Sequence, residues 1–225
     1  MVKMQNPSTQ VEVRVVIFSL KESRLSVLLV PGQTGNPANT WQLPGKTIHP
    51  ALSLEKLASQ SIQEIVGDHE FYLEQLYTYG DLDRHPNLRL ISVVYFALIS
   101  SNVEIVDKSR NALQPDWFAV DALPHLIMDH HNIVKYALRR LRYKLEYSAV
   151  GFELLPEFFS LSELQHTYEL ILGVKLDKRN FRRRILKAGI IERTPHRRAG
   201  EGRPAQLYRY RDDAIAEVKA RRLFP

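Results

Sequence analysis

A strand, a tight turn and an amphipathic helix follow one another between residues 41 and 67. This strand–turn–helix unit strongly limits the fold that the first part of the chain can adopt. The run Trp41-Gln42-Leu43-Pro44-Gly45 predicts a strand that ends in a turn. The segment from Ser53 to Val66 predicts a helix that stops at Gly67. Side chains three and four positions apart share one face of such a helix. The unit can therefore present several side chains to one ligand.

This unit resembles the Nudix box, G-x5-E-x7-R-E-U-x-E-E-x-G-U, in which U is a bulky apolar residue. In that box, clustered carboxylates on the helix hold divalent cations that bridge a pyrophosphate. We align Ile62 with the first U and Gly67 with the late glycine. The chain departs from the box at four places. Lys46 occupies the place of the first glycine, and Gly45 lies one position earlier. Leu52 replaces the first glutamate, Gln60-Ser61 replaces Arg-Glu, and Ile65 replaces the last glutamate.

The aligned segment keeps one box carboxylate, that of Glu64. Mg²⁺ demands near-octahedral oxygen geometry and gives up water reluctantly, so a single carboxylate is a poor site for it. The resemblance therefore predicts a Nudix scaffold that has lost hydrolysis and carries no metal or cofactor. The alternative is an ordinary strand–turn–helix unit that is unrelated to the family.

The composition is that of a globular protein with room for two domains. The chain has 225 residues, of which 44% are hydrophobic and 25% charged. It contains no cysteine, which excludes disulfides and thiolate metal sites. No apolar run is as long as a membrane span, and the N-terminus lacks a signal-peptide pattern. We therefore expect a cytoplasmic protein with no membrane partner.

Excess positive charge is confined to the last third of the chain. Residues 1–150 hold 15 Lys and Arg against 15 Asp and Glu, whereas residues 151–225 hold 16 against 10. Between Lys175 and Arg211 there are 13 basic and 3 acidic residues. This asymmetry indicates a polyanionic partner for the C-terminal part. The alternative is a basic face that is merely solvated.

Residues 1–150 mix strand and helix patterns. Apolar runs predict strands over 11–18, 25–30, 71–79, 89–99 and 116–118, with a hairpin at 21–24 and a loop at 31–40. Helical spacing predicts a closing helix from Asp129 to Tyr147, with Asp129 as its N-cap. Mixed strands with two helices predict an α+β domain, an α/β/α sandwich of the Nudix type. They argue against a doubly wound parallel sheet.

Residues 151–225 carry the pattern of a winged helix-turn-helix domain. The signals, in chain order, are a capping box at Ser160-Leu161-Ser162-Glu163, a stop at Gly173, a cap at Asp177 and a stop at Gly189. Phe181, Ile185 and Leu186 are expected on the inner face of the second helix. Strands at 190–193 and 206–210 enclose a basic hairpin that contains glycine. Two helices followed by such a hairpin are typical of this domain.

The second helix and the hairpin hold the candidate DNA contacts. The helix enters a major groove, where guanidinium groups read guanine edges or bind phosphates, and Asn180 is the candidate adenine contact. Arginines of the hairpin are expected at phosphates or in a minor groove. The predicted set is Lys178, Arg179, Asn180, Arg182, Arg183, Arg184, Arg193, Thr194, His196, Arg197, Arg198 and Arg203. The three arginines at 182–184 span about 200° of helix surface, so they cannot all face bases.

A degenerate Nudix domain followed by a winged helix is similar to the Nudix-related transcriptional regulators, of which NrtR is the best-known group. The most specific matches are Trp41–Gly45, Tyr79–Arg84 and the segment from Leu176 to Arg183. The resemblance implies a homodimeric bacterial repressor of NAD-metabolism genes, which binds a palindromic DNA operator and is released when ADP-ribose occupies the Nudix pocket. The box and the loop Asp83–Asn87 depart from the commoner pattern of the group.

The candidate effector residues follow from the need to neutralise a pyrophosphate without metal. The predicted set is Arg14, Trp41, Lys46, Asp81, Arg84 and Arg89. Arg14 is included because an arginine in an apolar strand is costly unless it has a partner. Trp41 is expected to stack on adenine, with a core position as the alternative. His49, His85, His130 and His131 have no partners at metal-ligand spacing and are expected at the surface or as caps.

Several functions stay open at this point. An active hydrolase of nucleotide sugars with an accessory nucleic-acid domain is the alternative to a regulator, and the missing box carboxylates argue against it. A regulator that senses another sugar phosphate is a second alternative. An RNA-binding or scaffolding protein, or a winged helix that binds protein instead of DNA, completes the set.

Overall fold

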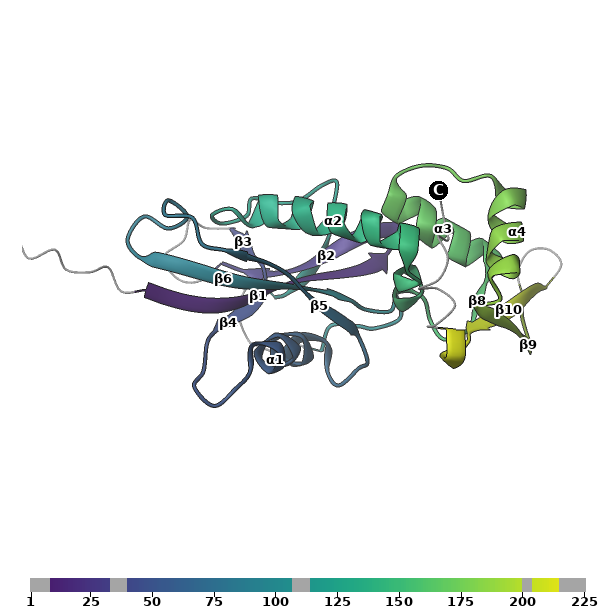
Figure 1. The fold of residues 1–225 in the computed structure, drawn as a ribbon, viewed down its shortest axis with the longest axis horizontal. Helices are drawn as coiled ribbons and strands as arrows, with labels where there is room; N and C mark the ends of the chain where they lie inside the picture. Colours follow the sequence, from purple (N-terminus) through teal and green to yellow (C-terminus); the bar gives the residue numbers. More distant parts are fainter. Residues whose placement is uncertain (1–8, 33–39, 107–113, 200–203, 215–225) are drawn as a thin grey trace, which may run out of the picture. The chain divides into compact units, whose positions relative to one another are not determined.

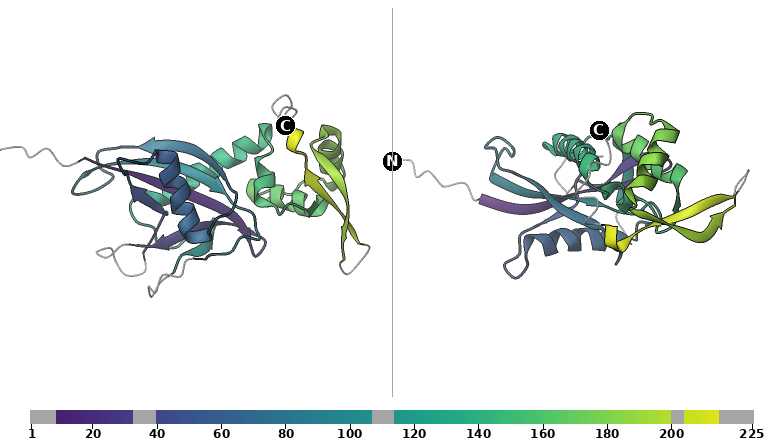
Figure 2. Two further views of the ribbon diagram at one scale, coloured as in Figure 1. Left: turned by 90° about the horizontal axis from the view of Figure 1, so that it is seen from below. Right: turned by 45° about the vertical axis from the view of Figure 1, so that its right-hand side comes forward.

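The computed structural model describes residues 9–32, 40–106, 114–199 and 204–214. They form two compact units, and Figures 1 and 2 show the elements of each. The first unit takes in residues up to 19, 26–99 and 103–137, and the second takes in 20–25, 100–102 and residues from 138 onward. The division falls inside a helix, whereas the sequence predicted a boundary at 150.

A mixed sheet forms the centre of the first unit. Its strands are β1 (Thr9–Lys21), β2 (Arg24–Pro31), β3 (Trp41–Gln42), β4 (Gly45–Thr47), β5 (Tyr72–Tyr79), β6 (Arg89–Leu98) and β7 (Asp116–Ala119). The order is β3-β2-β1-β6-β5, with β4 paired to β1 and β7 to β2. The pair β1 and β6 is parallel, with Thr9 opposite Arg89 and Phe18 opposite Leu98. β4, β5 and β7 pair antiparallel with their neighbours.

Two helices lie against this sheet. Figure 1 shows α1 (Leu54–Val66) on one side of it and α2 (His130–Tyr147) on the other. Leu57, Ile62 and Ile65 of α1 pack in one core cluster with Val13 and Ile17 of β1. Val16, which lies between these two on β1 and points to the other face, is equally buried. The expected α/β/α sandwich is therefore what residues of the first unit form.

Local signals fix both ends of α1. The Ser53 side chain accepts a hydrogen bond from the backbone N–H of Lys56, as an N-cap does. Gly67 ends the helix with φ of 82°, a left-handed value that favours glycine. The helix therefore occupies the predicted range. The helix α2 begins at His130, directly after the predicted N-cap residue Asp129, and the carboxylate of Asp129 binds Arg84.

The second unit contains a helix-turn-helix and a small sheet. Its elements after α2 are the 3₁₀ helix η1 (Val150–Leu154), β8 (Phe159–Ser160), α3 (Leu161–Leu172), α4 (Lys178–Ala188), β9 (Ile191–Arg198), β10 (Ala205–Tyr210) and η2 (Asp212–Ala214). The sheet order is β8-β10-β9. The capping box of Ser160 and Glu163 is present, and Gly173 and Gly189 end the two helices in left-handed conformations. The predicted winged helix-turn-helix is therefore observed, with η1 and β8 in addition.

One packing prediction for α4 was wrong. Phe181 and Ile185 are buried as expected, whereas Leu186 is 51% exposed. Successive residues of a helix are rotated by about 100°, so Leu186 lies well outside the face that Phe181 and Ile185 share. Two further segments of interest, the loop at 33–39 and Arg203, lie outside the described residues. No helix in the described part of the chain is long and apolar enough to span a membrane.

Candidate functional site

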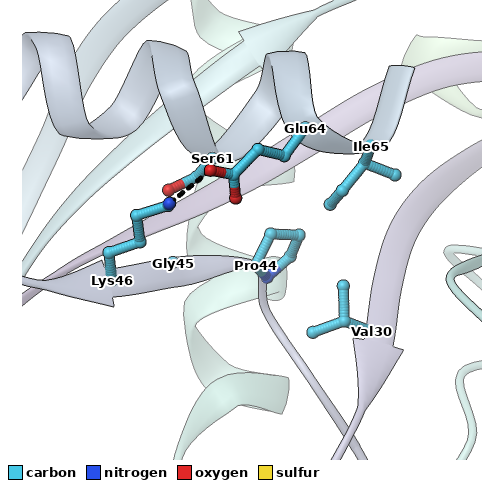
Figure 3. Close-up of a pocket in the computed structure, with 7 residues that line it drawn as sticks. All are labelled: Val30, Pro44, Gly45, Lys46, Ser61, Glu64 and Ile65. Carbon is cyan, nitrogen blue, oxygen red and sulfur yellow. Dashed lines mark hydrogen bonds and ion pairs between the residues drawn. The ribbon is translucent and has the colours of Figure 1, made fainter. Parts of the chain in front are cut away.

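A cavity of about 280 Å³ opens between α1 and the β3–β4 segment of the first unit. Its lining residues are Val30, Pro44, Gly45, Lys46, Ser61, Glu64 and Ile65. Figure 3 shows that the Lys46 side chain comes from β4 and the Glu64 side chain from α1, and that the two meet across the cavity. The aligned box positions therefore line this cavity from two sides.

Lys46 and Glu64 form an ion pair in this cavity. Lys46 Nζ lies 2.5 Å from Glu64 Oε1, and the side chains are 33% and 63% exposed. Ser61, on the same helix face as Glu64, donates its hydroxyl proton to the carbonyl oxygen of Leu57 at 2.8 Å. The polar groups of the cavity are thus a cation, a carboxylate and a hydroxyl that is already engaged as a donor.

The Nudix box implies a divalent cation, and the residues present do not fit one. Ser61 and Ile65 occupy positions where the box has glutamates, and the one aligned carboxylate that remains, on Glu64, is paired with Lys46. Within the described residues, no group of three or more His, Cys, Asp or Glu is placed to hold a metal ion. A Mg²⁺ site built from oxygen ligands is therefore not formed by this donor set.

Gly45 brings β4 close to β1. A Cβ at this position would lie 2.1 Å from the carbonyl oxygen of Val13 and 2.7 Å from Arg14 Cδ. Gly45 pairs with Arg14 in the antiparallel register of β1 and β4. The glycine is therefore required by this close approach, and Lys46, the next residue, is free to turn its side chain toward α1.

The side chains of Arg14, which is partly buried, and His130 hold the backbone that leads into the cavity wall. Arg14 donates to the carbonyl oxygen of Leu43 at 2.9 Å, and the backbone N–H of Leu43 donates to His130 Nδ1 at 3.0 Å. His130 is fully buried. Burial, followed by the charge of the nearby Arg14, lowers its pKa to about 3. The ring is therefore neutral at pH 7. The prediction that His130 lies at the surface or caps a helix was wrong, because the side chain is buried and binds the backbone of a distant segment.

Arg14 also begins a chain of buried polar contacts. It forms an ion pair with Glu12 at 2.6 Å, and Glu12 accepts a hydrogen bond from the Ser92 hydroxyl at 2.7 Å. Arg84 donates to Ser92 at 3.0 Å and binds both oxygens of Asp129, at 2.7 and 2.9 Å. Arg14 and Arg84 are therefore internally paired, and neither lines the cavity.

The other predicted effector residues lie away from the cavity lining. Asp81 is exposed, and Arg89 donates to the carbonyl oxygen of Gly80. Trp41 is half-buried, and its ring meets that of Phe118 edge-on at a centroid distance of 4.6 Å. Of the predicted set, Lys46 is the residue that the structure places in the cavity.

Sequence reasoning missed several residues of this region. Ser61, Glu64 and Ile65 were recognised as box positions and not as cavity residues, although helical spacing places 61, 64 and 65 on one face. His130 carries no sequence signal of its role, because its partner, Leu43, is 87 residues away. The Arg84–Asp129 pair likewise joins segments 45 residues apart.

The outer face of α4 in the second unit is basic. Lys178, Arg179 and Arg183 are exposed, and Arg183 donates to the side-chain oxygen of Asn180 at 2.9 Å. Arg182 and Arg184 are half-buried, and Arg182 donates to the hydroxyl of Ser162 in α3 at 3.0 Å. The structure therefore separates the three consecutive arginines and turns Arg183 outward.

The turn between α3 and α4 is held by one carboxylate. Glu169 accepts hydrogen bonds from the backbone N–H of Leu176 at 2.9 Å and from the Gln165 side chain at 3.0 Å, and it pairs with Lys175. These interactions, the Leu176 N–H first, lower the pKa of Glu169 to about 2. Glu169 therefore stays ionised at pH 7 and fixes the direction in which α4 leaves the turn.

The hairpin residues of the predicted DNA-contact set divide into two groups. Arg193, His196 and Arg197 are exposed. Arg198 is also exposed, and it pairs with Glu163 and donates to the carbonyl oxygen of Phe158. Thr194 is buried and donates its hydroxyl proton to the carbonyl oxygen of Leu207 at 3.0 Å. Thr194 therefore supports the hairpin from inside.

Comparison with known proteins shows which family combines these two units. The sequence model of the NrtR DNA-binding winged helix domain matches residues 151–210. The ADPR responsive transcriptional repressor NtrR of Acinetobacter baylyi is 34% identical over 212 residues, which cover 92% of this chain and 84% of that protein. The chain belongs to the NrtR family.

Solved structures support the same assignment for both parts of this NrtR-family chain. NrtR of Shewanella oneidensis complexed with a 27mer DNA matches with a TM-score of 0.81 and 32% identity, over 92% of this chain and 95% of that one. The NUDIX domain of the same protein, complexed with ADP ribose, matches with a TM-score of 0.50 and 25% identity, over 63% of this chain and 94% of that one. A MutT/nudix family protein from Enterococcus faecalis shares the fold, at 21% identity and a TM-score of 0.70.

Proposed function

We propose that this protein is a transcriptional repressor that binds a DNA operator through residues 151–225 and is released by ADP-ribose bound to residues 1–150. One observation carries the proposal: a winged helix of the NrtR type, with a basic outer face on α4, follows a Nudix fold whose box is built for something other than metal. Membership of the NrtR family adds the expectations that the protein is a homodimer and that its targets are NAD-metabolism genes.

The α4 surface supports binding to double-stranded DNA. Arg179 and Arg183 lie four residues apart and are both exposed, so they share a face that a major groove can receive. Arg183 orients the Asn180 side chain through a hydrogen bond. We assign Arg179, Asn180 and Arg183 to the groove, and Arg193, Arg197 and Arg198 of the hairpin to phosphates.

The cavity supports ligand binding without hydrolysis. Nudix-type hydrolysis needs carboxylates that hold divalent cations, whereas the aligned carboxylate here, that of Glu64, is paired with Lys46. We therefore propose that ADP-ribose is an effector and not a substrate. Assays of ADP-ribose with Mg²⁺ or Mn²⁺ should give turnover far below about 1 s⁻¹, the low end of ordinary enzyme rates. A rate of that order would favour the alternative of an active hydrolase.

A binding measurement tests the proposed function as a whole. Double-stranded DNA that the protein selects from a random pool is labelled, and its complex is followed by fluorescence anisotropy while ADP-ribose is added. We expect release of the DNA by ADP-ribose, with adenosine as the control ligand that lacks phosphate. Selection of no DNA would contradict the repressor assignment, and an unchanged complex at saturating ADP-ribose would contradict the assignment of the effector.

A further inference from the structure

The cavity beside α1 has the electrostatics of an ion pair and not of a metal site. Among its seven lining residues, Lys46 is the cation and Glu64 the anion, so their formal charges cancel. The Nudix box would place glutamates at 61 and 65 as well, where this chain has Ser61 and Ile65. A cavity lined by three carboxylates needs a bound cation to receive a phosphate, whereas this cavity already contains a cation, the ammonium of Lys46 on β4.

We propose that the Lys46 ammonium takes the place of the metal and binds the diphosphate of the effector, and that Glu64 is a built-in counter-ion that the diphosphate displaces. This inference rests on the proposed function, because it names the chemical group of the effector that the cavity receives. It differs from that function in making binding independent of divalent metal. It also makes Glu64 a competitor of the ligand.

The donors of the cavity point to Lys46 as the group that meets the anion. The Ser61 hydroxyl already donates to Leu57, and Pro44 has no backbone N–H to offer. The other side chains of the lining, those of Val30 and Ile65, are apolar. Lys46 Nζ carries three N–H donors, and it holds one carboxylate oxygen of Glu64 at 2.5 Å.

The pair is weak enough to be exchanged. Both partners are accessible to water, at 33% and 63% exposure, and such pairs contribute little because water screens them. A diphosphate offers the ammonium more negative charge and more acceptor oxygens than one carboxylate does. Displacing Glu64 therefore costs little, and the charge-assisted hydrogen bonds to the diphosphate outweigh that cost.

The size of the cavity agrees with a subsite that receives one part of a nucleotide sugar, such as its diphosphate. Its volume is about 280 Å³, just below the range of about 300–1,000 Å³ typical of pockets that enclose complete small molecules. The adenosine and terminal ribose of ADP-ribose would therefore lie outside this cavity. The cavity is thus the anion subsite of a larger binding surface.

Calorimetric titration of the full chain tests the exchange, with ADP-ribose and, separately, inorganic pyrophosphate as probes. Lys46→Met should weaken both probes roughly tenfold to hundredfold, as expected for lost charge-assisted hydrogen bonds. Glu64→Gln should tighten both roughly two- to fivefold, because the competing charge is removed. Addition of EDTA or Mg²⁺ should leave wild-type affinity within about twofold. Lys56→Met and Glu55→Gln, exposed positions of α1 outside the cavity, are matched controls and should leave both affinities unchanged.

The outcomes separate this inference from the proposed function. Unchanged affinity in Lys46→Met, weaker binding in Glu64→Gln, or a requirement for Mg²⁺ would overturn the exchange while leaving ADP-ribose as the effector. Binding of pyrophosphate with the expected pattern, but no binding of ADP-ribose, would support the exchange and overturn the effector. Failure of both probes to bind wild-type protein overturns the anion subsite itself.

Discussion

His130 shows how one side chain can serve the backbone of a distant segment. Its Nδ1 accepts the Leu43 N–H, so its ring proton is on Nε2, which has no hydrogen-bond partner within the described residues. Burial, followed by the charge of Arg14, lowers the pKa of His130 to about 3, from about 6.5 in an unfolded chain. At a pH between these two pKa values, His130 is therefore protonated in the unfolded chain and neutral in the folded protein.

This pKa difference gives stability a defined pH dependence. The contribution of His130 is complete above pH 6.5 and is lost progressively as pH falls toward 3, at up to about 1.4 kcal/mol per pH unit. His130→Asn keeps an acceptor oxygen near the position of Nδ1 and does not titrate. The free energy of unfolding, measured in urea, should fall between pH 7 and pH 5 by about 1–2 kcal/mol more for wild type than for the variant. Equal losses would contradict the assignment, and the exposed His131→Asn should behave as wild type.

Gly45 allows a second test of a single position. Adding a Cβ places it 2.1 Å from the Val13 carbonyl oxygen, which is backbone and cannot rotate away. Gly45→Ala should therefore lower the free energy of unfolding by about 1–3 kcal/mol, as overpacking does. Gly80→Ala is the matched control, because its nearest atoms would lie 3.8 and 3.9 Å from the new Cβ. Equal midpoints in urea for the two variants would show that β1 and β4 can separate at little cost.

At the level of secondary structure, α3 and α4 could be predicted well from the sequence, because their signals are local. Ser160, Gly173, Asp177 and Gly189 act within four residues of the backbone groups that they cap. The strand β8 could not be predicted, since two residues form it only by pairing with β10, about 48 residues later. Leu186 was misplaced because an apolar side chain beside a buried one need not share its face.

The candidate site was less predictable than the elements that carry it. Lys46 was found because it occupies a box position, and it does line the cavity. Arg14 and Arg84 were predicted to bind the effector. In the structure, however, Arg14 is paired with Glu12 and Arg84 with Asp129. Sequence shows that a buried arginine needs a partner, but it does not show whether that partner is a ligand or another side chain. Here Glu12 lies on the same strand as Arg14, and Asp129 lies 45 residues from Arg84.

The exposure of Arg183 on α4 gives a prediction about DNA binding. Arg183→Ala should weaken binding of the selected DNA more than binding of DNA of unrelated sequence, as expected for an arginine that reads bases in a groove. Lys56→Ala removes the same charge from α1 and should change neither quantity. Arg182 is anchored to Ser162, so Arg182→Ala is expected to weaken binding less than Arg183→Ala. The reverse order would mean that α4 turns a different face to the DNA.

Among the helices of the described residues, α2 is the one that is divided between the two units, and the ends of β1 and β2 that meet at their hairpin are divided as well. Its residues up to Ala137 belong to the first unit, and those from Leu138 belong to the second. Its start is fixed twice within the first unit: Asp129 binds Arg84, and His130 binds the backbone of Leu43, two residues before Gly45 of the cavity. A change at the cavity wall therefore has a short route to a helix that continues into the DNA-binding part.

Asp129→Asn tests this route, since it removes the charge that fixes Arg84 while keeping an acceptor oxygen. For the wild type, we expect ADP-ribose and DNA to oppose each other by about 1–3 kcal/mol, and linkage requires each to weaken the other by the same factor. In the variant, each ligand alone should bind nearly as it does to wild type. The factor by which each ligand weakens binding of the other should be smaller, because the start of α2 is less firmly held. Titration of ADP-ribose into free and DNA-bound protein measures this factor for wild type and for Asp129→Asn. An unchanged factor in a variant with a normal unfolding midpoint would exclude the Arg84–Asp129 contact from the coupling and leave His130 as the connection to test.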